Sequence, residues 1–204
     1  MLTSYAAGRD HHVRLSYSLV KRGIDIVLAT ILLLVTLPLL LVACVAIALD
    51  SPGSCIYRQW RMGVGERPFK IIKLRTMVTY ADRLGPELTQ DADPRITRVG
   101  SVLRRWSVDE FPQLLNVLAG HMSLVGPRPE LVSIAETYTD SQRRVLQVRP
   151  GLTGWAQVNG RDDLSIHAKL ELELEYVVNR TNMRDLAIMA RTVSVVLSGE
   201  GTKR

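Results

Sequence analysis

The chain has few cysteines and few aromatic residues. It holds only two cysteines in 204 residues, Cys44 and Cys55, and aromatic side chains make up 5% of it. The cysteine spacing matches no zinc or redox motif and excludes a disulfide framework, so it indicates a reducing compartment. Charged residues at 23% and hydrophobic residues at 47% are ordinary for a globular chain, which excludes a disordered or collagen-like protein.

The motifs of several enzyme classes are also missing. There is no Walker motif, and Gly63-Val64-Gly65 lacks the remaining glycine of a dinucleotide fingerprint. His121 and His167 have no Gly-x-Ser-x-Gly partner. The sequence therefore argues against a P-loop enzyme, a dinucleotide-dependent enzyme and a serine hydrolase.

Positive charge exceeds negative charge. The 26 lysines and arginines outnumber the 20 aspartates and glutamates, which gives a formal net charge of +6. The mean hydropathy is nevertheless slightly positive at +0.09. A chain that is both basic and apolar is expected to meet an anionic membrane surface or a phosphorylated ligand, and not nucleic acid. Its length suits one domain with a single core.

The sequence contains one long apolar segment. Residues 26–49 carry no charge, and a helix of this length can cross a bilayer core of roughly 30 Å. A cleavable secretory signal is disfavoured, because the run is longer than a signal core and no small-x-small site closes it before Asp50. The segment is therefore expected to contact lipid, either as a spanning helix or as a re-entrant hairpin.

Two features favour the hairpin. Pro38 lies near the middle of the run, where it deletes a backbone hydrogen bond and clashes with the preceding turn. Basic residues flank the run on both sides, and a hairpin returns both flanks to the cytoplasmic face. A kinked spanning helix stays open as the alternative. Lys21 and Arg22 are expected at the membrane surface, and Asp25 either pairs with Arg22 or lies near the helix N-terminus.

The rest of the chain predicts an α+β fold that is mainly helical and has a small β-hairpin. We expect a polar lead-in over residues 1–20, a re-entrant helix-break-helix over 21–50 and a cytosolic or interfacial domain over 51–204. Residues 79–98 are polar and lack a clear period, so they are expected to form a surface excursion.

Local patterns place the elements of this domain. β-branched and aromatic residues predict hairpin strands over 55–59 and 69–74. Helical patterns cover residues 99–105, 111–118, 164–179 and 185–197. The last of these helices either packs against the core or lies at the lipid headgroup boundary.

Two adjacent carboxylates, Asp109 and Glu110, follow two arginines at a predicted helix start. Ser107 precedes Glu110 at the spacing of a capping box, in which serine and glutamate bind exposed backbone amides. The alternative is chemical: a carboxylate at a helix N-terminus near arginines stays ionised and can serve as a nucleophile or a magnesium ligand. Pro112 favours a helix start at or just before Asp109, because proline is tolerated only in a first turn.

Rigidly held cations are candidates for binding phosphate. Arg128 stands between two prolines, and its planar guanidinium can bind phosphate through two parallel hydrogen bonds. Arg161, and Lys73 with Arg75 on the predicted hairpin, offer similar groups. A solvated surface charge is the alternative for each of these three.

Several longer motifs occur in a fixed order from Lys21 to the C-terminus. They are Lys21-Arg22 with Asp25, Asp50-Ser51-Pro52-Gly53, Tyr57-Arg58-Gln59, Lys73-Leu74-Arg75-Thr76-Met77, Asp109-Glu110-Phe111-Pro112-Gln113-Leu114, residues 122–129 and Arg149-Pro150-Gly151-Leu152-Thr153-Gly154. In this order they resemble the bacterial sugar transferases, the small monotopic phosphoglycosyl transferases. That family breaks its re-entrant helix at a Ser-Pro pair. Leu37-Pro38 stands there in this chain, so Pro38 must bend the helix without the serine hydroxyl.

The resemblance implies an enzyme of the bacterial inner membrane with a catalytic domain over 51–204 that faces the cytoplasm. Such an enzyme transfers a sugar-1-phosphate from a UDP-sugar to undecaprenyl phosphate, releases UMP and starts a surface glycan or glycoconjugate. The resemblance implies Asp109 as the nucleophile that forms a covalent phosphosugar intermediate, Glu110 as its partner and Mg²⁺ bound near Asp109. It also implies phosphate- or nucleotide-binding positions at Lys73, Arg104, Arg128 and Arg161.

Two other classes remain open on the residues alone. One is a membrane-anchored adaptor whose basic face binds anionic lipid or nucleic acid, and the other is a single-pass scaffold. An adaptor has no reason to contain the Asp109-Glu110 pair together with Arg128. No pattern in the sequence specifies the sugar or an oligomeric state.

Overall fold

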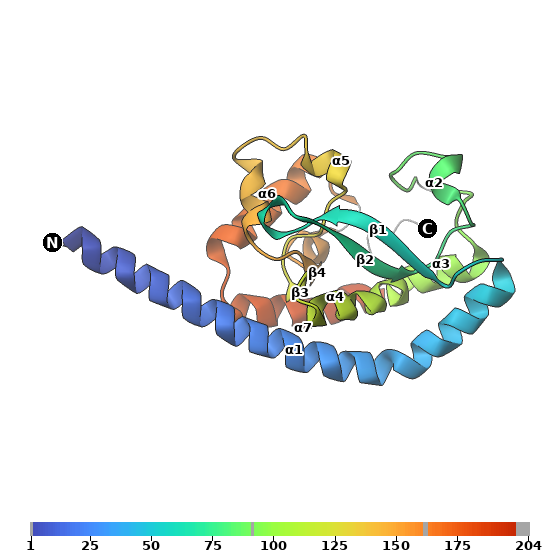
Figure 1. Ribbon diagram of the computed structural model, residues 1–204, viewed down its shortest axis with the longest axis horizontal. Helices are drawn as coiled ribbons and strands as arrows, with labels where there is room; N and C mark the ends of the chain where they lie inside the picture. Colours follow the sequence, from blue (N-terminus) through green and yellow to red (C-terminus); the bar gives the residue numbers. More distant parts are fainter. Residues whose placement is uncertain (1, 91, 161–162, 199–204) are drawn as a thin grey trace.

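The structure is a computed structural model that describes residues 2–90, 92–160 and 163–198, with side chains from residue 18 onward. A long helix, α1 (Leu2–Asp50), runs along one side of a small α+β domain (Figure 1). The short helix α4 (Leu114–Leu118) lies between α1 and an antiparallel hairpin of β1 (Ile56–Met62) and β2 (Pro68–Leu74). The mainly helical class with a small hairpin is confirmed.

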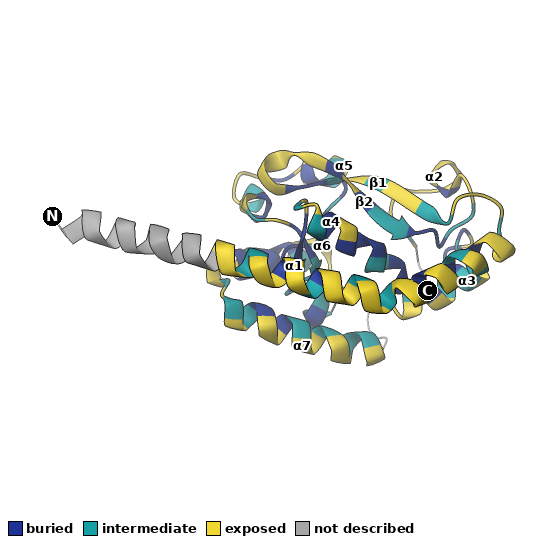
Figure 2. Cartoon of the chain, turned by 60° about the horizontal axis from the view of Figure 1, so that its bottom comes forward, coloured by how far each residue is buried: buried dark blue, intermediate teal, exposed yellow. Residues whose placement is uncertain are grey.

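A narrow stripe of α1 packs against the domain. Asp25, Ala29, Leu40, Ala43 and Ile47 are buried on this stripe. Most of the rest of the apolar segment is exposed, as the yellow parts of the α1 ribbon show (Figure 2). Among the described residues, 18–50 form the one helix long and apolar enough to cross a membrane. An apolar surface of this size on a folded domain is expected to face lipid.

Helix α1 bends without breaking. Pro38 lies inside the helix, and Figure 1 shows α1 changing direction in the part of the chain that contains it. The Thr36 hydroxyl donates to the Leu32 carbonyl oxygen at 2.7 Å. Such a bond from a threonine to the carbonyl one turn earlier bends helices. Thr36 thus supplies a hydroxyl one position before Leu37, which has none. The predicted interruption of the helix is a bend in one continuous helix.

The helix also begins earlier than the sequence suggested. It starts at Leu2. The residues expected to form a polar lead-in are therefore helical from Leu2 onward. This stretch contains no proline, and Gly8 is its one glycine. Nothing in it stops a helix that continues into the apolar segment.

The remaining predicted elements are found close to their expected positions. The hairpin pairs Tyr57 with Lys73 and Arg61 with Phe69 across its strands. The predicted helices correspond to α3 (Arg98–Arg105), the 3-10 helix η2 (Val108–Gln113) continuing into α4, α6 (Ile166–Asn179) and α7 (Asn182–Ser198). The shorter elements are η1 (Val64–Glu66), α2 (Ala81–Leu84), α5 (Val132–Ala135), η3 (Gln142–Gln147) and η4 (Gln157–Asn159).

The excursion over residues 79–98 is less exposed than its polarity suggested. Asp93 and Arg95 are both buried in it and form an ion pair of 2.6 Å. Arg95 also donates to the carbonyl oxygens of Ala81 and Pro86 at 3.0 and 2.9 Å. A buried pair with these hydrogen bonds holds the excursion in one shape.

The structure contains a second sheet of two parallel strands that the sequence patterns did not predict. It consists of β3 (Ser123–Val125) and β4 (Gly151–Thr153), which lie in two of the motifs quoted above, residues 122–129 and 149–154. The backbones approach closely here: a Cβ on Gly126 would lie 2.4 Å from the Arg149 carbonyl oxygen. Only glycine fits at this position, and the pairing brings the two segments together.

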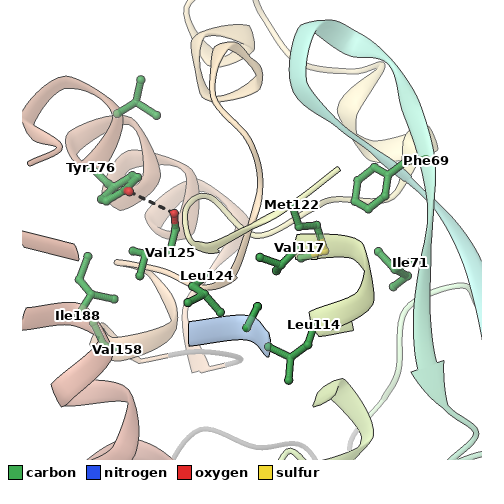
Figure 3. Close-up of a cluster of buried hydrophobic side chains, with 12 residues drawn as sticks. Phe69, Ile71, Leu114, Val117, Met122, Leu124, Val125, Val158, Tyr176 and Ile188 are labelled. Atoms are coloured by element: carbon green, nitrogen blue, oxygen red, sulfur yellow. Dashed lines mark hydrogen bonds between the residues drawn. The ribbon is translucent and has the colours of Figure 1, made fainter. Parts of the chain in front are cut away.

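The main core joins α1, the hairpin, α4, β3, α6 and α7. Its members include Phe69, Leu114, Met122, Tyr176 and Ile188 (Figure 3). The Tyr176 hydroxyl lies 2.7 Å from Asp185 Oδ1 and 3.3 Å from the Val125 carbonyl oxygen. This hydroxyl is therefore satisfied although the ring is buried.

Helix α7 packs against the core, which is one of the two roles left open for it. Ile188 and Asp185 are buried against the domain. On the opposite face Met183, Leu186, Val193 and Leu197 are exposed. The helix thus packs against the core and presents an apolar stripe outward.

Candidate active site

The acidic pair lies at the start of η2, where the sequence placed it. The helix begins at Val108, and Pro112 lies within it, as predicted. The capping box is not formed. Ser107 has a φ of 54°, and its side chain makes no capping hydrogen bond. The side chain of Glu110 is instead directed to cations.

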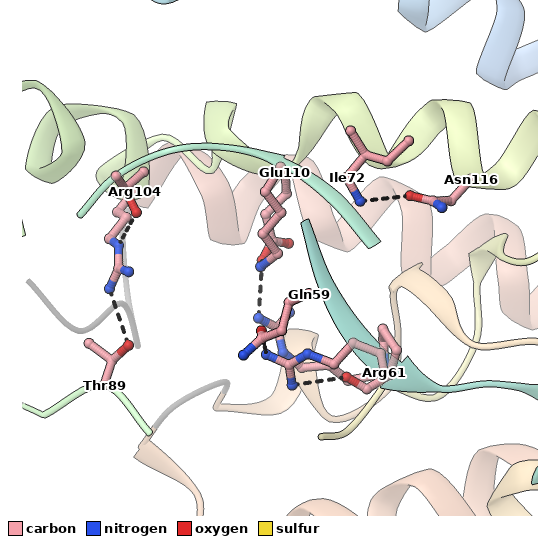
Figure 4. Close-up of polar contacts among 11 residues, drawn as sticks. Gln59, Arg61, Ile72, Thr89, Arg104, Glu110 and Asn116 are labelled. Atoms are coloured by element: carbon pink, nitrogen blue, oxygen red, sulfur yellow. Dashed lines mark hydrogen bonds and ion pairs between the residues drawn. The ribbon is translucent and has the colours of Figure 1, made fainter. Parts of the chain in front are cut away.

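Two cationic side chains bind the same oxygen of the Glu110 carboxylate. Lys73 Nζ lies 2.7 Å from Oε1, and Arg128 NH2 lies 3.0 Å from the same atom. Figure 4 shows Glu110 beside Arg61 and Gln59 of β1. Charge-assisted hydrogen bonds of this kind are stronger than neutral ones and fix the carboxylate. They leave Oε2 free of these two cations.

The hairpin and α4 position Lys73. The Asn116 side chain on α4 accepts from the Ile72 amide at 3.0 Å and donates to the Lys70 carbonyl oxygen at 2.8 Å. This side chain completes the hydrogen bonding of β2 on its outer edge. Because η2 and α4 are contiguous, the bond fixes the strand that carries Lys73 relative to Glu110.

Arg128 is held by its surroundings on several sides. The Gly151 amide donates to the Pro127 carbonyl oxygen at 2.8 Å. Arg61 NH1 donates to the Pro129 carbonyl oxygen at 3.3 Å. The two prolines also restrict the backbone. The guanidinium is thus presented to Glu110 from a stiff segment.

Arg104 lies on α3 beside the acidic pair. Its Nε donates to Thr76 Oγ1 at 2.8 Å, and NH1 lies 3.5 Å from Thr89 Oγ1 (Figure 4). Gly100 of the same helix packs against the Thr76 carbonyl, where a Cβ would come within 2.0 Å. This contact sets the distance between α3 and the end of the hairpin.

The two carboxylates titrate in opposite directions. Burial raises the pKa of Asp109, which is 8% exposed, although Lys73, Arg104 and Arg128 act against it. Burial would also raise the pKa of Glu110, but Arg128 and Lys73 outweigh it and hold that pKa well below its usual range. Glu110 is therefore permanently charged, and its charge adds to the effect of burial on Asp109.

The Asp109 carboxylate is available for chemistry. Within the described part of the chain, no group donates a hydrogen bond to it. No group of three or more His, Cys, Asp or Glu side chains that could hold a metal occurs among the described residues. Mg²⁺, however, typically uses one or two carboxylates together with waters and substrate phosphates. Asp109, followed directly in the chain by Glu110, fits that type of site.

The other predicted residues fall elsewhere. Lys21 and Arg22 bind within the protein: Lys21 Nζ lies 2.8 Å from Asp185 Oδ2, and Arg22 NH1 donates to the Val117 carbonyl oxygen at 2.7 Å. Asp25 accepts from the Leu124 amide at 3.0 Å and lies near Lys21, not Arg22. Arg161 lies outside the described residues.

Arg75 has a structural role instead of a phosphate-binding one. Its guanidinium is buried and donates to the carbonyl oxygens of Ser51 and Pro52, just after α1 ends. It also donates to Thr79 Oγ1 at 2.8 Å. Arg75 therefore secures the junction between α1 and the hairpin.

Sequence reasoning missed three residues around the site: Arg61, Asn116 and Glu173. Arg61 carries a sequence signal, because its alternation with Tyr57 and Gln59 puts the three on one face of the strand. Asn116 and Glu173 carry none, since each acts on a segment more than forty positions away.

Fold and site together define a membrane-associated enzyme domain with an acidic pair set among cations. Residues 16–199 match the family model for bacterial sugar transferases. The chain belongs to that family.

Similar proteins include two UDP-glucose:undecaprenyl-phosphate glucose-1-phosphate transferases. The one from Caulobacter vibrioides is 43% identical over 91% of this chain and 72% of its own length. The one from Escherichia coli is 44% identical over 86% of this chain and 39% of its own length. A UDP-N-acetylgalactosamine-undecaprenyl-phosphate N-acetylgalactosaminephosphotransferase from Aeromonas hydrophila is 40% identical over 92% of this chain and 46% of its own length. The chain thus spans less than half of the last two relatives.

Proposed function

We propose that this protein transfers a sugar-1-phosphate from a UDP-sugar to undecaprenyl phosphate, releases UMP and so starts a membrane-linked glycan. The single observation that carries this proposal is the arrangement of Asp109, Glu110, Lys73 and Arg128. It offers one carboxylate that no described group donates to, next to a second one held by two cations. The names of the relatives agree with this donor and this acceptor.

The chemistry is two successive displacements at one phosphorus atom. An oxygen of ionised Asp109 attacks the β-phosphorus of the UDP-sugar, and the bond from that phosphorus to the bridging oxygen breaks, so UMP leaves. An oxygen of undecaprenyl phosphate then attacks the same phosphorus, and the bond to Asp109 breaks. One phosphoanhydride replaces another, so no further energy source is needed.

The residues around Asp109 have separate tasks in this scheme. Lys73 and Arg128 keep Glu110 charged and in place, and both cations, with Arg104, offset the charge that gathers when a carboxylate meets a diphosphate. Glu110 Oε2, which these two cations leave free, can accept a hydrogen bond from an incoming lipid phosphate that carries a proton. We propose Asp109 as the ligand for Mg²⁺, which when bound would neutralise the diphosphate charge.

The attachment of α1 supports a monotopic, re-entrant arrangement at the membrane. Asp25 is tied to the domain through the Leu124 amide at 3.0 Å, and Asp50 through the Val99 amide at 3.1 Å. A straight helix would separate these two residues by about 37 Å, so the segment is long enough to cross a bilayer core of roughly 30 Å. A spanning helix would place its two ends on opposite sides of the membrane. Since both ends bind one domain, α1 would lie in one leaflet with its exposed apolar face in lipid. We propose the cytoplasmic leaflet of the inner membrane.

The apolar stripe of α7 would contact the same leaflet. In Figure 2, α7 lies beside α1 on the same side of the domain, and both show exposed surface. Phospholipids would then contact two helices, and the prenyl acceptor would approach Asp109 from headgroup depth.

The test is UMP release with undecaprenyl phosphate, Mg²⁺ and a panel of UDP-sugars. Asp109→Asn should abolish turnover, and mass spectrometry of donor-treated wild type should find a phosphosugar on Asp109. The matched control is Asp140→Asn, an exposed carboxylate outside the site, which should behave as wild type. Full activity of Asp109→Asn would end the proposed mechanism.

The topology has its own test. A Thr3→Cys variant without Cys44 and Cys55 should stay unlabelled by an impermeant thiol reagent in intact cells and become labelled after permeabilisation. Labelling from outside would show a spanning helix instead.

A further inference from the structure

The Glu173 carboxyl group has no part in the chemistry above, yet it contacts the segment that carries Arg128. Glu173 lies on α6 and is 4% exposed. Its Oε1 accepts a hydrogen bond of 2.8 Å from the backbone amide of Arg128. Glu173 is thus connected to the ion pairs of Glu110 through Arg128.

This hydrogen bond is unusually important for the local backbone. Proline has no N–H, so in Pro127-Arg128-Pro129 the Arg128 amide is the sole backbone donor. Its donation to Glu173 fixes the segment against α6. At the far end of the same residue, NH2 lies 3.0 Å from Glu110 Oε1. A displacement at the amide therefore moves the guanidinium.

We propose that Glu173 is a positioning residue that holds Arg128 in place for Glu110. This inference rests on the function proposed above, because it assigns Glu173 to that same site. Glu173 itself does not touch the reacting atoms.

The groups that face Glu173 favour its neutral form. Glu130, which precedes α5, and Tyr138, which follows it, lie on one side, and Arg128 and Lys169 are the nearby cations. Burial, reinforced by Glu130, raises the pKa of Glu173 to about 8, although the Arg128 amide and the two cations act against it. Ionisation above that pH adds a negative charge that competes with Glu110 for the Arg128 guanidinium.

The experiment compares Glu173→Gln and Glu173→Ala with wild type in the UMP-release assay between pH 6 and 9.5. Gln keeps an acceptor without a charge, so it should keep activity near wild type at pH 7 and lose the decline that wild type shows near pH 8. Ala removes the acceptor and should lower kcat by about 10- to 100-fold, as a misplacement near 1 Å does. The matched control is Glu171→Ala on the exposed side of α6.

A double substitution separates positioning from general stability. In an Arg128→Ala background, Glu173→Ala should cause little further loss, because its effect acts through Arg128. Equal losses in both backgrounds would overturn the proposal, and so would an alkaline decline that persists in Glu173→Gln. If wild type releases no UMP, the proposed function fails. If wild type is active and all Glu173 variants match it, only this inference fails.

Discussion

Lys73 Nζ lies 2.7 Å from Glu110 Oε1, and this contact joins the β-hairpin to the helix that carries the acidic pair. It makes Glu110 a permanently charged neighbour of Asp109. It also means that the residue next to Asp109 depends on a lysine 37 positions earlier in the chain.

Arg128 should not be replaceable by lysine. Arg128→Lys keeps a charge but loses the planar fork and the reach to Glu110 Oε1, so kcat/KM should fall by about 10- to 100-fold at unchanged thermal stability. Initial rates of UMP release and a melting curve check this. Arg105→Lys is the control, because Arg105 is an exposed arginine on α3. Equal rates for wild type and Arg128→Lys would show that charge alone suffices.

Gly100→Ala should lower turnover although Gly100 is not itself a residue of the site. The added Cβ would lie 2.0 Å from the Thr76 carbonyl oxygen, so α3 must move away from the residue that binds Arg104. We expect the free energy of unfolding to fall by about 1–3 kcal/mol, with reduced turnover.

The control for this change is Gly23→Ala on α1, where no atom beyond the helix's own backbone and the two neighbouring residues lies within 4 Å of the added methyl group. It should leave turnover intact and should not lower the stability, because alanine is a better helix former than glycine. Denaturant titration and UMP release measure the two effects. A stable and fully active Gly100→Ala protein would contradict the close packing of α3 on Thr76.

Asp25→Ala should loosen the attachment of α1. Its carboxylate is buried, and removing it leaves the Leu124 amide without its partner, which costs about 1–3 kcal/mol. A lower melting temperature and faster hydrogen exchange at Leu124 are the expected results. Asp82→Ala, an exposed change on α2, serves as the control. Unchanged exchange at Leu124 would argue against the contact.

The stability of the protein should depend on pH through Glu173. Its pKa is raised from 4.5 to about 8 in the folded protein, so between these values the folded state holds a proton that the unfolded state has released. Stability therefore falls as pH rises through this window and levels off above it. Glu173→Gln lacks this loss, so its melting temperature relative to wild type should increase from pH 5 to pH 8. A difference that stays constant with pH would refute the neutral acid.

Local sequence patterns were sufficient for much of the secondary structure. The hairpin, α3, η2 with α4, α6 and α7 were expected within a few residues, because alternation, helical spacing and Pro112 are properties of neighbouring residues. The parallel pair of β3 and β4 was not expected. Each strand is three residues long, and its pairing depends on a close approach at Gly126 that no local pattern reveals.

The sequence by itself determined the apolar helix, the acidic pair, the stiff Pro-Arg-Pro segment and the motifs of the bacterial sugar transferases. Only the tertiary structure decided that Glu110 binds Lys73 and Arg128 instead of capping a helix, that both ends of the apolar segment are tied to one domain, and that Glu173 holds Arg128. The reason is that helix and strand propensities act between near neighbours along the chain. The partner of a buried charge, by contrast, is chosen by packing between segments that lie far apart in sequence.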